Sequence, residues 1–148
     1  MPSRNEHLAV VRDNLECLKR VCCDEYQSPA WATTVIFYSG LHVVNCVFEG
    51  LGHLHETDHK GRNAKLKRDN RFRKIWRHYK PLWQDSLVAR YLSSDEAGTV
   101  SSFGDYMSAS KVVEVHLNHN FKQILASAEK LLGTPLDVEI PKGVLSPQ

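Results

Sequence analysis

Basic side chains are concentrated in one segment of the sequence, from His59 to Lys80. This segment holds ten lysines and arginines and a single acid, Asp69, so its formal charge is +9, whereas the whole 148-residue chain carries only +2. The remaining residues, 9 basic and 16 acidic, therefore sum to −7. Clustered cations attract polyanions because binding releases condensed counterions. We therefore expect RNA or another polyanion as a partner, with candidate contacts at His59, Lys60, Arg62, Lys65, Arg68, Lys74 and Arg77.

A candidate catalytic pair lies in the same segment. Histidine can act as an acid or a base near neutral pH, and arginine can stabilise the charge of a pentavalent phosphate, so together they suit metal-independent RNA cleavage. His78 follows Arg71 by seven residues and Arg73 by five. Residues seven apart share one face of a helix, whereas residues five apart point about 140° away from each other. Arg71 and His78 can therefore act within one chain, whereas Arg73 and His78 require a site shared between two copies.

A second polar set interrupts an otherwise apolar segment, residues 29–50. Tyr38, His42, Asn45 and Glu49 are spaced four, three and four, which places them in one stripe along a helix. Such a stripe either faces solvent and satisfies its own hydrogen bonds, or lines a polar groove that holds a nucleotide or a partner protein. The spacing leaves both interpretations open.

The histidine-rich stretch 53–59 invites a metal-site interpretation. His53, His55, Asp58 and His59 are similar in spacing to the H-x-H-x-D-H site of metallo-β-lactamase-like hydrolases, but one residue too many separates His55 from Asp58. That fold also needs strands, which the sequence does not predict. We therefore expect a polar loop, with no bound metal and no cofactor.

The remaining metal-ligand candidates also have unsuitable spacing. His116 and His119 are three apart, and no carboxylate completes a metal set at helical spacing on their face, so we expect surface histidines. Cys22 and Cys23 are adjacent, which is not the usual spacing of zinc ligands. Reduced, partly buried thiols are the expectation for the cysteines.

The periodicity of apolar residues predicts helices throughout. We expect an all-α, antiparallel four- to five-helix bundle that forms a single domain over residues 1–148, with a C-terminal tail over 134–148. The expected helices are 4–26, 29–50, 59–79, 82–92 and a long last helix, whose buried face begins at Tyr106 and which ends before Gly133. Residues 93–104 read as a loop. The helix 29–50 is apolar nearly all round and should lie at the centre of the bundle.

Local signals set the ends of these helices. Ser28 followed by Pro29 predicts a helix start, with serine as the N-cap. Pro81 should end or kink the basic helix, since a proline disfavours helical geometry in the residue before it. Phe72, Ile75, Trp76 and Tyr79 follow helical spacing, which favours a core stripe over a platform for stacked bases.

Two features bear on location. The first residues contain no apolar stretch of a secretion signal, and the longest apolar stretch, 35–48, is too polar and too short to span a bilayer. We expect a cytoplasmic protein without membrane contact.

The order of these motifs resembles the HEPN superfamily of small helical bundles. The matching positions, within about residues 5 to 132, are Phe37, Tyr38, His42, the His59-Lys60-Gly61 turn, and the Arg90-Tyr91 pair. The resemblance implies a bundle of four or five helices that is commonly a dimer. It also implies work in RNA cleavage, toxin–antitoxin pairs or phage defence, or a role as the non-catalytic partner of a nucleotidyltransferase. An antitoxin or a nucleotidyltransferase is thus an expected protein partner, and Arg90 joins the candidate binding residues.

Catalytic HEPN members carry an arginine, four to six residues, and then a histidine. Four residues separate Arg73 from His78 and six separate Arg71 from His78, so the resemblance implies these three as catalytic candidates. The family motif usually lies nearer the last helix, where this sequence offers Lys111 and His116, with lysine in place of arginine. Two functions remain open on this basis, a metal-independent ribonuclease and a non-catalytic module that binds a nucleotide, nucleic acid or protein.

Overall fold

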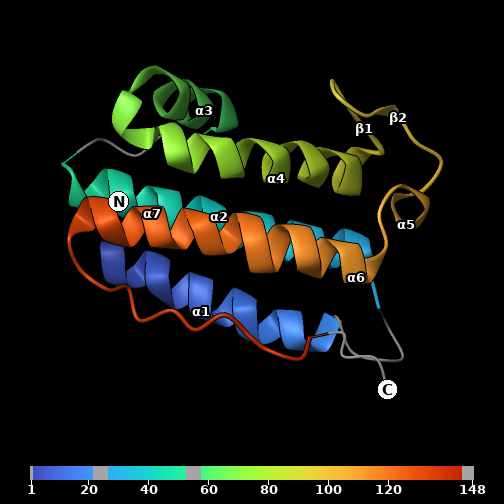
Figure 1. Cartoon of the computed structure of the whole chain (residues 1–148), viewed down its shortest axis with the longest axis horizontal. Helices are drawn as coiled ribbons and strands as arrows, with labels where there is room; N and C mark the ends of the chain where they lie inside the picture. Colours follow the sequence, from blue (N-terminus) through green and yellow to red (C-terminus); the bar gives the residue numbers. More distant parts are fainter. Residues whose placement is uncertain (1, 22–26, 53–57, 145–148) are drawn as a thin grey trace.

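The computed structural model describes residues 2–21, 27–52 and 58–144, and most of them are helical (Figure 1). The elements are, in chain order, α1 (Arg4–Val21), α2 (Pro29–Gly50), α3 (His59–Arg68), the 3₁₀ helix η1 (Asn70–Phe72), α4 (Arg73–Tyr91), β1 (Ser93–Ser94), β2 (Gly98–Thr99), α5 (Phe103–Tyr106), α6 (Ala109–Val112), the π-helix η2 (Val113–Phe121) and α7 (Lys122–Leu132). This is the all-α helical bundle that the periodicity predicts. The predicted extension of the first helix over residues 22–26 lies outside the described residues.

Helix α2 is the centre of the bundle, as predicted. Ser28 caps its start by accepting a hydrogen bond from the Trp31 backbone N–H at 3.3 Å, and Pro29 is its first residue. The helix packs against α1, α4 and α7, and Ile36, Phe37 and Phe48 are fully buried. By length and composition α2 could cross a membrane, but 72% of its most apolar 18-residue window is buried inside the bundle.

The basic segment forms two helices where one was predicted. Asp58 caps α3, and Asp69 ends it with an extended backbone. The Asp69 carboxylate then accepts from the Arg71 backbone N–H at 2.9 Å and starts η1, which leads directly into α4. The break at Asp69 turns α4 onto the bundle, and Phe72 is buried there.

Pro81 does not end the basic helix, because α4 runs from Arg73 to Tyr91 with Pro81 in its interior. Proline removes one backbone hydrogen bond from a helix interior. Tyr79 and Leu82, on either side, are both completely buried. Their packing holds this part of the helix against the core and offsets the missing bond. The predicted helices 59–79 and 82–92 are thus divided at Asp69 instead of at Pro81.

The last long helix changes geometry midway. Helices α6, η2 and α7 follow one another without a gap, and η2 has the hydrogen-bonding pattern of a π-helix. Tyr106 was predicted to lie on this helix but lies in α5. The two helices are separate because Met107 is extended and Ser108 caps α6. The predicted buried face is otherwise confirmed at Val113, Leu117, Phe121, Ile124 and Ala128.

The two segments that were read as irregular are partly ordered. Within 93–104, Ser93 pairs with Thr99 in a two-stranded antiparallel ladder, and α5 follows. After Gly133, the described part of the tail runs along α1 (Figure 1), where Leu136 is buried and its carbonyl oxygen accepts from Arg12 at 3.1 Å. The tail is therefore packed on the bundle as far as it is described.

Candidate functional site

Five polar side chains form a continuous series of hydrogen bonds between α4, α5 and η2, here called the polar network. The Tyr106 hydroxyl donates to Asp85 Oδ1 at 2.6 Å, and Asp85 Oδ2 lies 2.6 Å from His116 Nε2. On the other side of that imidazole, His116 Nδ1 lies 3.1 Å from Asn120 Nδ2. Asn120 Oδ1 in turn lies 3.1 Å from His78 Nδ1. The network therefore joins a carboxylate to the candidate catalytic histidine.

The direction of each hydrogen bond follows from the chemistry of the groups. An ionised carboxylate only accepts, so His116 donates from Nε2 to Asp85, and the Asn120 amide nitrogen, which only donates, faces His116 Nδ1 as its acceptor. Asn120 donates to that nitrogen through its amide NH₂, and its amide oxygen must then accept from His78. His78 consequently carries its proton on Nδ1. This leaves Nε2 of the neutral His78 ring as the acceptor nitrogen.

The middle of the polar network is buried, whereas Tyr106 at one end is 38% exposed. The His116 side chain is completely buried, Asn120 is 4% exposed, and the Asp85 side chain is 13% exposed. Buried polar groups that satisfy one another in this way specify one arrangement, because each broken bond leaves an unsatisfied group behind. Burial, together with the hydrogen bond to Asp85, raises the pKa of Tyr106 to about 12, so the phenol remains a donor. The earlier expectation that His116 is a surface histidine is wrong.

A second histidine stands beside the end of the network. The rings of His78 and His119 have centroids 5.1 Å apart and planes inclined by 81°. His78 is half-buried on α4, whereas His119 is exposed on η2, as expected of a surface histidine. Two imidazoles from two different helices thus meet at the surface, and only one of them belongs to the polar network.

A basic groove lies between the start of α4 and the antiparallel α7. Its volume is about 740 Å³, and its lining includes Arg71, Arg73, Lys74 and Lys130, with no acid among the described lining residues. Asp69 binds the Arg71 guanidinium at 2.7 Å but is not part of the lining. Lysines and arginines grouped without acids are the electrostatic footprint of a site for phosphates.

The two histidines lie next to the basic groove along the line where α4 packs against η2 and α7, here called the seam. Lys74 and His78 are four residues apart on α4 and so share a face. On the opposite helix, Gln123 lines the groove and follows His119 by four residues. Both histidines therefore lie about one helical turn, or ~5.4 Å, beyond the groove lining. A strand of nucleic acid held in the groove would reach them.

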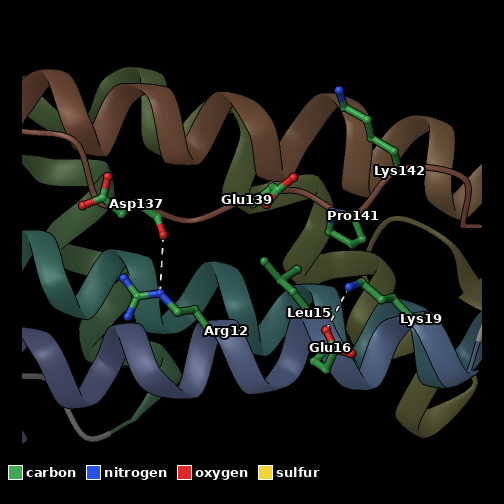
Figure 2. A pocket seen from close by; sticks show the side chains of 8 residues that line it. All are labelled: Arg12, Leu15, Glu16, Lys19, Asp137, Glu139, Pro141 and Lys142. Atoms are coloured by element: carbon green, nitrogen blue, oxygen red, sulfur yellow. Dashed lines mark hydrogen bonds and ion pairs between the residues drawn. The ribbon is translucent and has the colours of Figure 1, made fainter.

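A second groove shows the contrast in charge. It lies between α1 and the tail, and Figure 2 shows the Arg12 guanidinium reaching the Asp137 carbonyl oxygen at 3.4 Å. Its volume is about 440 Å³, and three basic residues are matched by three acids, with a Lys19–Glu16 ion pair at 2.9 Å on its rim. This groove is electrically balanced and holds the tail, so it is not a candidate for binding polyanions.

The structure brings the three predicted catalytic residues to one seam but not into contact. Arg71 and Arg73 line the basic groove, where Arg71 is bound to Asp69 and the Arg73 guanidinium donates to Asn70 Oδ1 at 3.3 Å. His78 lies beyond the groove, bonded to Asn120. The two arginines therefore line the groove, whereas His78 contacts Asn120 and His119 of η2.

Arg62 is not on the basic surface, contrary to expectation. Its side chain is 4% exposed, and its Nε donates to Asn45 Oδ1 at 3.3 Å. The guanidinium also lies 3.4 Å from His59 Nδ1 and beside the buried Tyr79 hydroxyl. Burial lowers the pKa of His59, with Arg62 and Arg90 adding to the effect, and burial raises the pKa of Tyr79. Arg62 is therefore a core residue that joins α3 to α2.

The predicted polar stripe of α2 is divided among several partners. His42 Nδ1 lies 2.9 Å from His7 Nδ1 of α1, and burial, followed by the charge of Arg62, lowers the pKa of His42. Asn45 is bonded to Arg62, and Glu49 is exposed. These three residues therefore hold α2 to its neighbours or face solvent, and they do not line one groove.

Tyr38, the first residue of the stripe, is half-buried and contacts Arg90 of α4. Arg90 donates to the Tyr38 hydroxyl at 3.3 Å and lies over the rings of Phe37, Tyr38 and Tyr91 at 5.3 to 5.7 Å. Within the described residues Arg90 forms no ion pair. A shallow groove of about 470 Å³ here is also lined by Trp31, which is 64% exposed. Of the three rings beside Arg90, Tyr91 is exposed, Tyr38 is half-buried and Phe37 is buried, and an arginine beside accessible aromatic rings is suited to a planar anion.

The other predicted binding residues form the outer basic surface. Lys60, Arg68, Lys74 and Arg77 are exposed, and Lys65 is half-buried with its Nζ 5.1 Å from the Phe48 ring centroid. Phe72, Ile75 and Tyr79 are buried and Trp76 is half-buried, which confirms the core stripe.

The structure describes only some of the residues that were considered as metal ligands or thiols. In the described ranges, no three histidine, cysteine or acidic side chains are grouped to hold a metal ion. His53 and His55 of the loop, and the adjacent Cys22 and Cys23, lie outside those ranges. Cys17 is an exposed free thiol, whereas Cys46 is buried, and burial raises the pKa of its thiol to about 11.

Asp85 and Asn120 were not predicted as site residues, His116 was expected at the surface, and Tyr106 was expected only on the buried face of the last helix. Asp85 follows His78 by seven residues and so shares its face of α4, while His116 and Asn120 are four apart and each immediately precedes a buried apolar residue. The sequence therefore offered one indication of these site residues, namely polar residues on the inner faces of two helices. The sequence does not indicate which of these residues contact one another, because that depends on how α4 packs against η2.

Comparisons with protein families, with curated proteins and with solved structures find no match to this chain.

Proposed function

We propose that this protein binds RNA in the basic groove between α4 and α7 and cleaves it without a metal ion, with His78 as the general base. Arg71, Arg73, Lys74 and Lys130 hold the phosphates. His78 Nε2 removes the proton of a 2′-hydroxyl, and the resulting oxygen attacks the neighbouring phosphorus. The reaction needs a base near neutral pH and cations around the phosphate, and both lie on this seam.

The observation that carries the proposal is the hydrogen bond from His78 Nδ1 to Asn120 Oδ1, one helical turn beyond the groove. It holds the imidazole in the tautomer whose acceptor nitrogen is Nε2. General bases are typically oriented by a further group in this manner. The half-buried position of His78 and the cationic groove beside it then favour the approach of an anionic strand.

A cleavage assay with tRNA or total RNA in the presence of EDTA tests the proposal. Wild type is expected to cut RNA and to leave DNA intact, because DNA lacks the attacking hydroxyl. His78→Ala should lower the rate by about 10²- to 10⁴-fold, the usual contribution of a general base. The matched control is Asn118→Ala, which removes an exposed side chain of η2 that has no assigned role and should leave both binding and the chemical step unchanged. RNA bound in a salt-dependent manner but never cut would leave binding as the function.

The proposal also covers the setting of the activity. The motifs described above support membership of the HEPN superfamily, a cytoplasmic homodimer, and a role in a toxin–antitoxin or defence system. An antitoxin or a nucleotidyltransferase is then the protein partner. Sedimentation of the purified protein, followed by co-purification with the product of a neighbouring gene, tests these points. A monomer that pairs with neither kind of protein would contradict them.

A second candidate function is supported by the Arg90 groove. A guanidinium within 5.7 Å of three aromatic ring centroids, in a groove that the exposed Trp31 also lines, suits a nucleotide bound without catalysis. Calorimetric titration of a nucleoside monophosphate into wild type and Arg90→Lys tests this. Lysine keeps the charge but loses the planar stacking, so nucleotide affinity should fall. Equal affinities in the two proteins would argue against a site at Arg90.

A further inference from the structure

We propose that His119 is the second catalytic residue of this site, the general acid that protonates the leaving 5′-oxygen, and that Asn120, His116 and Asp85 are positioning residues for His78. This inference rests on the proposed function and adds a second group to its chemistry. It also assigns the polar network a role in the reaction.

The first support is the arrangement of the two rings. His78 and His119 come from different helices, and their centroids are 5.1 Å apart. Each ring nitrogen must come within about 2.6 to 3.2 Å of the oxygen that it serves. The separation lets both rings reach one phosphodiester group, with the attacking oxygen at one ring and the leaving oxygen at the other.

The second support is the difference between the environments of the two rings. His78 is half-buried and bonded to Asn120, whereas His119 is exposed and takes no part in the polar network. Pairs of titratable groups in different environments are the usual basis for separate acid and base roles. His78 is held with an acceptor nitrogen toward substrate, and His119 can take a proton from solvent before each turnover.

The reaction balances with these two groups alone. His78 Nε2 accepts the proton of the 2′-hydroxyl as the bond from O2′ to phosphorus forms. The bond from phosphorus to O5′ breaks, and the proton on His119 passes to O5′. The products are a 2′,3′-cyclic phosphate and a 5′-hydroxyl. His78 ends protonated and His119 neutral, and exchange with solvent restores both.

The positioning role follows from the direction of the hydrogen bonds. Asp85 fixes the proton of His116 on Nε2, so that His116 Nδ1 must accept, and Asn120 is thereby held with its oxygen toward His78. His116 is completely buried and cannot contact substrate. π-helical segments occur frequently at functional sites, and η2 carries His116, His119 and Asn120 within nine residues.

Substrates with different leaving groups test the role of His119. An RNA dinucleotide has a poor leaving group that needs an acid, whereas uridine 3′-(4-nitrophenyl phosphate) releases nitrophenolate without one. His119→Ala should lose about 10²- to 10⁴-fold of its rate on the dinucleotide and less than about tenfold on the activated ester. His78→Ala should lose rate on both. Asn118→Ala, an exposed position of the same π-helix, is the matched control and should keep both rates.

The outcomes separate this inference from the function on which it rests. Equal losses of His119→Ala on the two substrates, or no loss on the dinucleotide, would overturn the role of His119, while a defect of His78→Ala would still support the ribonuclease. A wild-type protein that cleaves neither substrate would overturn both.

The positioning role is tested at Asn120 by a measurement that a purely structural residue would not affect. In wild type, the nitrogen-15 spectrum of the His78 ring should show the tautomer with the proton on Nδ1. In Asn120→Ala this preference should disappear, with a lower kcat, an unchanged KM and an unchanged circular dichroism spectrum. An unaltered His78 tautomer in Asn120→Ala, or an unaltered kcat, would overturn the positioning role.

Discussion

The Nε2 atom of His116 lies 2.6 Å from Asp85 Oδ2, although the His116 side chain is completely buried. This contact connects η2 to α4 in the interior, and it decides which nitrogen of His116 faces Asn120. The orientation of His78 at the surface is therefore linked to the Asp85 carboxylate through three hydrogen bonds, by way of Asn120 and His116.

The first prediction concerns this buried contact. Asp85→Ala should lower the free energy of unfolding by about 1 to 3 kcal/mol, because it leaves the buried imidazole N–H of His116 without an acceptor. Urea denaturation measures the change. Asp95→Ala, which removes an exposed acid, should alter stability by less than about 0.5 kcal/mol. Equal stabilities of the two variants would contradict a structural role of the contact.

The second prediction concerns the basic groove. Lys74→Ala and Lys130→Ala should each weaken the binding of single-stranded RNA, because each removes a cation from the groove lining. The slope of log affinity against log salt concentration should become shallower by about 0.7 for each lost phosphate contact. Lys142→Ala, in the charge-balanced groove of Figure 2, should change neither quantity. A smaller slope in Lys142→Ala than in Lys74→Ala would place the contact surface elsewhere.

The third prediction concerns acid stability. Burial lowers the pKa values of His42 and His59 from the usual histidine value of 6.5, and the charge of Arg62 lowers both further. Below that value the unfolded chain binds more protons than the folded chain, so the free energy of unfolding should fall as the pH drops below 6.5. Urea titrations at about pH 7.5 and about pH 5.5 measure this difference. His42→Gln should reduce it, and an unchanged difference in that variant would exclude His42 as a source.

The fourth prediction concerns the cysteines. Burial raises the pKa of Cys46 to about 11, whereas Cys17 is exposed. The thiolate is the reactive form, so Cys46 should react with iodoacetamide much more slowly than Cys17 in the folded protein. Peptide mapping by mass spectrometry distinguishes the two sites. Comparable labelling of both before unfolding would mean that α2 opens readily.

The helices could be predicted from local sequence more fully than their packing. The periodicity of α2 and the Ser28-Pro29 start were sufficient to locate the central helix, because both signals act within a few residues. The continuation of α4 through Pro81 was not predictable in this way, since it depends on the burial of Tyr79 and Leu82 against other elements.

The candidate site could be predicted only in part for the same reason. His78 and the basic residues of the groove stand out in composition and spacing. Asp85 and Asn120 do not, because each appears as a single polar residue until α4 is placed beside η2. Arg62 was wrongly predicted to lie on the surface, because it belongs to a run of basic residues. In the structure it is buried and contacts Asn45 and His59.

Cleavage of a single-stranded RNA oligonucleotide in EDTA, by wild type and by His78→Ala at equal RNA occupancy, tests the central claim most directly. The account predicts that wild type yields fragments ending in a 2′,3′-cyclic phosphate, and that His78→Ala forms them at least about 10²-fold more slowly while it binds the oligonucleotide equally well. A wild-type protein that binds the oligonucleotide without cutting it, or a His78→Ala variant that cuts at the wild-type rate, would contradict it.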